Sequence, residues 1–149
     1  MQFDELQSWV EEGFPEAQGK VGNWLIDDDG LTVQILADPN FGRMRIIISL
    51  NKISEVDPSI YSRLMQANFE STLDARYAIS NGYIWSVFIH PLESLTEDML
   101  DSGYLQTLTA AQTFGTSYTS GVVNFGTGSD PAAAEFAMLQ ELKRTNRLM

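Results

Sequence analysis

The sequence contains no cysteine and has few of the features that mark export or membrane insertion. Without cysteine, disulfide frameworks, thiolate zinc sites and cysteine nucleophiles are all excluded. The opening stretch "MQFDELQSWVEEGF" has no basic cluster before an apolar run, so it does not fit a signal peptide. No apolar run approaches the roughly 18 residues of a membrane span. We therefore expect a cytoplasmic protein with no membrane partner.

Basic residues are also scarce. Lysine and arginine total 9, aspartate and glutamate total 20, and the formal net charge is −11. Because phosphate binding requires a basic footprint, this balance argues against a nucleic-acid partner. The excess negative charge either serves solubility or favours basic and apolar partners, and the composition leaves both explanations open.

Motifs for catalysis and metal binding are missing as well. His90 is the single histidine, at the end of a predicted strand, where a lone ring is usually packed or half-exposed. The "DDDG" run at 27–30 fails as an EF-hand loop, because its glycine would make Leu25 and Leu36 the terminal ligands. It predicts a tight turn. We expect no enzyme, no catalytic, cofactor-binding or metal-binding residue, and no cofactor; a deep pocket where carboxylates converge on His90 would revive an enzymatic reading.

The overall composition and the spacing of apolar residues are typical of a folded α+β domain. Hydrophobic residues make up 44% of the 149 residues and charged residues 19%, enough for a core of ordinary size. The apolar spacing predicts the order α-βββ-α-ββ-α, an antiparallel-rich sheet packed with helices, plus a C-terminal helical extension. We assign the domain to 1–126, and a linker and C-terminal helix to 127–149. The helices are predicted at 3–13, at 58–70 and from 97 to before 124, and the strands at 21–26, 31–37, 43–50, 73–80 and 83–90.

The last two strands are predicted to form a hairpin with a defined register. Asn81-Gly82 signals a two-residue turn, because both central residues of a type I′ turn have positive φ. Cross-strand partners share a face, and one face of this hairpin is nearly all apolar. The other face pairs a polar strand with an apolar one, as partner sites often do, unless a loop or the C-terminal helix covers it. The predicted partner-binding residues on that face are Tyr83, Trp85, Val87 and Ile89.

The helix predicted at 58–70 has apolar residues over roughly 200° of its surface, about twice what one core-facing stripe requires. Either the helix is deeply buried within the domain, or its second side is buried against another chain. We favour the second explanation, which predicts a homodimer. The predicted dimer-interface residues are Ile60, Tyr61, Leu64, Met65 and Phe69.

Two stretches resemble a known family. "YSRLMQANFEST" is similar to the end of the second helix in class I type III secretion chaperones, the Tir-chaperone-like family. "YAISNGYIWSVFIHPLESLTEDMLDSGYLQTLTAAQTF" is similar to that family's last hairpin and third helix. The chain departs from the family at "ESTLDARY", which replaces a glycine-rich run, and in its extension at 127–149. The YbjN-like proteins, which are thought to share this fold, fit these departures about as well.

The resemblance implies a binding function without catalysis. Members of the family are homodimers that pair through the second helix and hold an extended effector segment against apolar patches. We therefore expect a dimeric, secretion-chaperone-like protein whose partner is a segment of a client or effector protein. The alternative is a YbjN-like regulatory or adaptor protein that binds a folded partner. By position, the resemblance assigns Ile60, Leu64, Met65 and Phe69 to the dimer, and Trp85, Val87 and Ile89 to the client surface.

Overall fold

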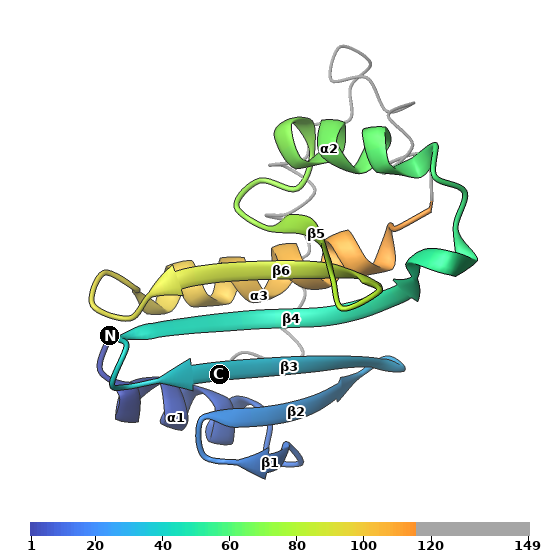
Figure 1. Ribbon diagram of the computed structural model, residues 1–149. Helices are drawn as coiled ribbons and strands as arrows, with labels where there is room; N and C mark the ends of the chain where they lie inside the picture. The colour runs from blue at the N-terminus through green and yellow to red at the C-terminus, as the bar shows by residue number, and fades with distance from the viewer. Residues whose placement is uncertain (116–149) are drawn as a thin grey trace.

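The computed structural model describes residues 1–115, which form one antiparallel sheet and the helices that pack on it (Figure 1). Within these residues the sheet has six strands in the order β1-β2-β3-β4-β6-β5. This is the α+β class predicted from the sequence, which is confirmed. In chain order the elements are α1 Phe3–Gly13, β1 Gln18–Lys20, β2 Asn23–Asp28, β3 Leu31–Asp38, β4 Arg43–Lys52, the 3-10 turn η1 Ile53–Glu55, α2 Ile60–Glu70, β5 Arg76–Ser80, β6 Tyr83–Pro91 and α3 Glu97–Gln112.

Two features differ from the sequence prediction by more than two residues. The short strand β1 was not predicted, because all three of its residues are exposed and give no alternating pattern. Strand β5 begins at Arg76 and not at Leu73, whose φ of 61° is incompatible with an extended strand. Helix α3 ends at Gln112, before residue 124 as predicted. The predicted domain boundary at 126 and the helix at 127–149 lie outside the described residues.

The main core lies between one face of the sheet, here called the inner face, and helices α1 and α3. Helix α3 runs behind β4 and β6 in the view of Figure 1. Leu6 and Val10 of α1 and Leu100 of α3 are completely buried against the sheet. Such burial, at about 25 cal/mol per Å² of apolar surface, is the main source of stability. The inner-face side chains of this core are Trp24, Ile26, Val33, Ile35, Met44, Ile46, Ile48 and Phe88.

Helix α2 packs on the inner face at the β5 end of the sheet. Its buried residues Leu64 and Ala67 form a second cluster with Tyr77, Ile84 and Ala110. Asn68 adds a two-way link to β5: its amide nitrogen donates to the carbonyl of Tyr77 over 3.1 Å, and its oxygen accepts from the N–H of Tyr77 over 2.7 Å. All three described helices therefore lie on the same side of the sheet.

Two buried aspartates connect the helices to each other and to the sheet. The indole Nε1 of Trp9 in α1 donates to Oδ1 of Asp101 in α3 over 2.9 Å. The hydroxyl of Tyr104 in α3 donates to Oδ2 of Asp28 in β2 over 2.7 Å. Asp28 is 1% exposed and Tyr104 is also 1% exposed, so these bonds are shielded from water. They fix how α1, α3 and β2 meet.

Replacing Tyr104 by phenylalanine is therefore expected to destabilise the protein. The change removes a buried donor to Asp28 and keeps the ring, so it is expected to lower the free energy of unfolding by about 1–3 kcal/mol. Urea unfolding followed by circular dichroism measures this difference. The matched control is Tyr83→Phe, since Tyr83 is 37% exposed and its change is expected to stay within about 0.5 kcal/mol. Equal losses in the two variants would contradict the assigned role of the Tyr104 hydroxyl.

Candidate protein-binding surface

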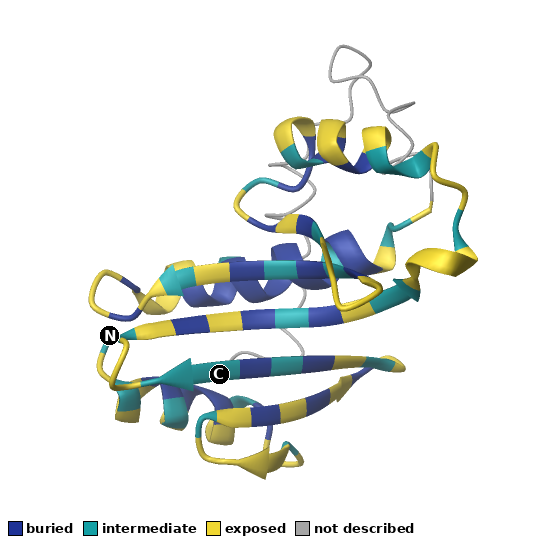
Figure 2. Ribbon diagram, in the orientation of Figure 1, coloured by how far each residue is buried: buried dark blue, intermediate teal, exposed yellow. Residues whose placement is uncertain are grey.

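The sheet face opposite the core, here called the outer face, carries none of the described helices. All three helices pack against inner-face side chains, and strand alternation directs the remaining side chains to the outer face. Figure 2 shows this alternation along β4 and β6, where buried residues alternate with exposed and half-buried ones. A sheet face of this kind is usually polar, so its apolar residues need a separate explanation.

The pairing register gathers apolar outer-face side chains on β4 and β6. Ile47 of β4 lies directly opposite Val87 of β6. Next to this pair, the ring of Trp85 meets that of Tyr83 edge-on, with 6.2 Å between the ring centres. Ile89 continues the row, 44% exposed. We call the following five residues the outer patch: Ile47, Tyr83, Trp85, Val87 and Ile89.

The indole of Trp85 has a fixed position within the outer patch. Its Nε1 donates to the carbonyl of Ser80 across the hairpin over 2.9 Å. The turn that sets this position has φ of 52° at Asn81 and 77° at Gly82, as a type I′ turn requires. The Trp85 ring is half-buried, and it is held by its own hairpin, since α1, α2 and α3 pack on the other face. Pre-organised aromatic side chains of this kind are common anchors for protein partners.

The hairpin has the register predicted from the sequence: Ser80 lies opposite Tyr83, and Ala78 opposite Trp85. The four predicted partner-binding residues therefore share the outer face, and their role in binding stays a prediction. Sequence reasoning missed Ile47. It lies in the run "RMRIIISL", where three consecutive isoleucines place apolar side chains on both faces of the strand. The polar–apolar alternation that would distinguish the two faces is therefore absent. Pairing β4 with β6 in the correct register would have placed Ile47 opposite Val87 and so identified it.

The five residues predicted for the dimer interface divide into two groups in the structure. Leu64 is 4% exposed, and Ile60 and Tyr61 are half-buried against the second cluster of the protein's own core. Met65 is 70% exposed and Phe69 is 92% exposed. These two lie four residues apart, so they are neighbours on one face of α2. Their pairing with a second chain stays a prediction.

A carboxylate at the start of α2 has a lowered pKa. Asp57 precedes the helix, and its Oδ1 accepts the backbone N–H of Ser59 over 2.9 Å. This backbone bond, a side-chain bond from Ser59 and the nearby charge of Arg63 lower the pKa of Asp57 below its usual value. Asp57 is thus held as a charged group where the helix dipole favours an anion.

No acid–base pair is formed around His90 in the described residues. Its ring stacks on Phe88 with 5.8 Å between ring centres, and its Nδ1 lies 2.7 Å from the carbonyl oxygen of Pro91. His90, Asp74 and Asp98 line a surface groove between β6 and α3, but no hydrogen bond in residues 1–115 joins either carboxylate to His90. Within the same range, no three acidic or histidine side chains are placed to hold a metal ion. None of the described helices combines the length and apolar character needed to cross a bilayer.

Comparison with known proteins identifies the fold. No protein-family model matches this chain, and no curated protein matches its sequence. A chain in the structure of the HopA1–SchA chaperone–effector complex aligns with a TM-score of 0.57 and 11% identity, over 75% of this chain and 94% of that one. The fold is chaperone-like. A chain in the crystal structure of the ExsC–ExsE complex shares this chaperone-like fold, with a TM-score of 0.60 and 14% identity, over 76% of this chain and 94% of that one.

Proposed function

We propose that this protein is a cytoplasmic, non-enzymatic, chaperone-like binding protein that holds an extended segment of a client protein on the outer patch. The observation that carries the proposal is the outer patch itself, an apolar row on a sheet face that no described helix covers. The chaperone-like fold supports it, because one structure that shares the fold is a chaperone–effector complex. Homodimers that pair through Met65 and Phe69 of α2 are part of the proposal.

The geometry of the outer patch suits an extended partner. Its members follow β6 from Tyr83 to Ile89, with Ile47 beside them on β4. A stable protein complex buries about 1,600 Å² in total, and an unfolded segment can reach this area by following a long surface. Apolar side chains of the client would lie on the rings of Trp85 and Tyr83. The charge of −11 favours clients with basic residues around these apolar positions.

The test is to purify the full-length tagged protein from its own host and to measure the mass of the complex. We expect two copies of the chain and one co-purifying polypeptide in stoichiometric amount. Limited proteolysis of the complex should leave the bound part of that polypeptide as a protected fragment, and circular dichroism should show that this fragment is unfolded when isolated. A partner that binds only as a natively folded domain would contradict the chaperone proposal and favour the adaptor alternative.

A further inference from the structure

Strand β6 extends beyond its neighbour β5. On one side, β6 pairs with β4 from Tyr83 opposite Lys52 to Pro91 opposite Arg43, with an irregularity in the register between Ser49 and Lys52. On the other side, β5 pairs with β6 only as far as Val87, which lies opposite Arg76. The stretch Phe88–Pro91 therefore has a strand on one side only among the described residues. An edge of this kind offers backbone groups to another strand.

The chain before β5 is held away from this edge by α3. Oε1 of Gln106 in α3 accepts the backbone N–H of Asp74 over 2.8 Å and that of Ala75 over 3.0 Å. The guanidinium of Arg76 donates to the carbonyls of Leu73 and Ala75. Without these bonds, Ala75 and Asp74 would be the next residues to pair with β6. The N–H of Ala75 also donates to the carbonyl of Thr72 over 3.2 Å. None of these bonds goes to β6, so this edge has no strand partner within residues 1–115.

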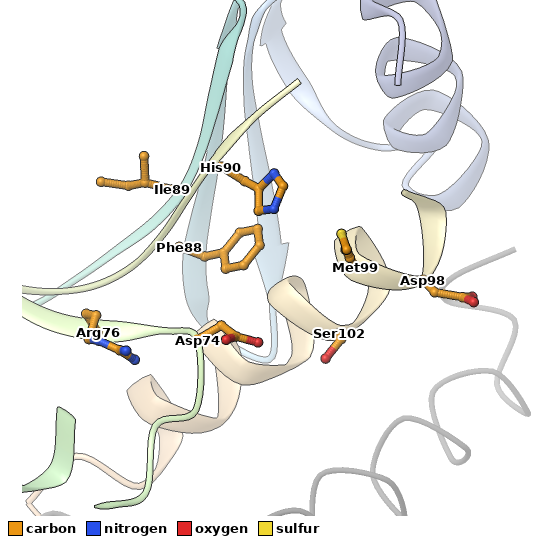
Figure 3. Close-up of a pocket in the computed structure, with 8 residues that line it drawn as sticks. All are labelled: Asp74, Arg76, Phe88, Ile89, His90, Asp98, Met99 and Ser102. Atoms are coloured by element: carbon orange, nitrogen blue, oxygen red, sulfur yellow. The ribbon is translucent and has the colours of Figure 1, made fainter. Parts of the chain in front are cut away.

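A groove of about 500 Å³ fills the space between this edge and the first turns of α3. In Figure 3, Phe88 and His90 project from β6 toward Met99 of α3, while Ile89 points to the opposite side of the strand. Met99 is 46% exposed. The eight residues that line the groove are Asp74, Arg76, Phe88, Ile89, His90, Asp98, Met99 and Ser102.

The backbone of Ile89 faces the side of β6 that β5 does not reach. In a hairpin with a two-residue loop, the flanking residues Ser80 and Tyr83 exchange hydrogen bonds. Alternation along β6 then directs the N–H and C=O groups of Tyr83, Trp85, Val87 and Ile89 toward β5. Because β5 begins opposite Val87, it provides no residue opposite Ile89. A strand added there would meet one N–H and one C=O in the middle of the groove.

The groove combines an apolar floor with an acidic rim. Met99 provides most of the exposed apolar surface, above the ring of Phe88, which is only 5% exposed, and the exposed carboxylates of Asp74 and Asp98 provide negative charge. Arg76, which carries the permanent positive charge among the described residues that line the groove, already donates to backbone carbonyls. A lysine or arginine side chain matches this combination, because its apolar stem can lie on the rings while its charge reaches a carboxylate.

We propose that the client segment adds a β-strand to β6 at Phe88–Pro91, with a lysine or arginine in the groove and apolar neighbours on the outer patch. This inference rests on the proposed function and names the chemistry of the client. Alternate residues of the added strand point to opposite faces of the sheet. The side chains of the added strand on one face would enter the groove, and those on the other face would lie beside Ile89 and continue the outer patch. The structure thus favours a client segment that alternates basic and apolar residues.

The test uses the full-length protein and a fluorescein-labelled peptide of about eight residues that alternates valine and lysine, a typical strand length. Fluorescence anisotropy measures its affinity, and NMR measures exchange of the Ile89 amide hydrogen. We expect binding that slows this exchange at least about tenfold, as a new strand hydrogen bond would. A peptide with glutamate in place of lysine, and one with proline at alternate valines, should bind at least about tenfold more weakly.

The matched protein variants separate local charge from net charge. The double variant Asp74→Asn and Asp98→Asn keeps similar shapes and hydrogen-bonding oxygens and is expected to weaken lysine-peptide binding about fivefold. Glu12→Gln with Glu16→Gln removes the same charge from exposed positions on and after α1, and it should change binding less than about twofold.

The outcomes distinguish this inference from the function on which it rests. The inference is overturned if the peptide does not bind, if Ile89 exchange is unchanged, or if both double variants weaken binding equally. It is also overturned if the Ile89 amide is already protected without peptide, because the edge would then belong to the protein's own chain or to a second copy. In each of these cases, the proposed function would still stand if a change at Trp85 lowers the affinity of the protein for its client.

Discussion

Glutamate at both Met65 and Phe69 is expected to convert the dimer into monomers, raising the dimer dissociation constant a hundredfold or more, about 2.8 kcal/mol. The two side chains are 70% and 92% exposed in the single chain, so the free subunit tolerates the change. In the proposed dimer, each subunit would bury two like charges in an apolar contact, where unpaired charges are strongly unfavourable. Sedimentation equilibrium over a range of protein concentrations measures the effect.

The control for the dimer variant places the same substitution on other exposed apolar side chains. Val21 is 59% exposed and Phe41 is 81% exposed, and both lie on turns of β-hairpins far from α2 along the chain. Val21→Glu with Phe41→Glu should leave the dimer unchanged. Dissociation by both pairs would show only a general effect of added charge. A monomeric wild-type protein would refute the dimer proposal directly.

Aspartate at Trp85 is expected to reduce client affinity at least about thirtyfold, as loss of a central aromatic anchor often does. The change removes the indole from the outer patch and places a charge where the cross-strand neighbours, Ser49 and Ala78, offer no cation to pair with it. Ile47→Asp is the second variant, since Ile47 lies beside the same patch opposite Val87. Isothermal titration with the purified client segment provides the measurement.

Folding and binding effects must be separated for these variants. Trp85 and Ile47 are half-buried on the outer face, so moderate destabilisation is expected and urea unfolding should accompany each titration. Thr32→Asp serves as the control, because Thr32 is an exposed polar residue of the same sheet outside the outer patch. Full client affinity in both patch variants, with their folds intact, would move the binding site elsewhere.

Local signals in the sequence predicted those parts of the fold that depend on neighbouring residues. Asn81-Gly82 fixes the last hairpin because both residues adopt the positive φ that the turn requires. The register follows, and with it the common face of Trp85 and Val87. The first helix was predicted equally well, because Leu6 and Val10 recur on one side and are completely buried there.

Features that depend on distant residues could not be predicted in this way. The start of β5 depends on Gln106, whose side chain binds Asp74 and Ala75 across 32 and 31 residues of sequence. The prediction of a strand from Leu73 missed this link, and with it the groove beside β6. The apolar character of α2 was recognised, but the division between buried Leu64 and exposed Phe69 required the position of α2 on the sheet.

The acidic rim of the groove also affects self-association of the protein. An open strand edge can pair with the same edge of another copy, which is a common route to aggregation. Such a pair would bring Asp74 and Asp98 of both molecules together, and like charges held close on a surface repel. The carboxylates that attract a basic strand would therefore oppose edge-to-edge pairing of two copies, and salt would weaken this protection by screening them.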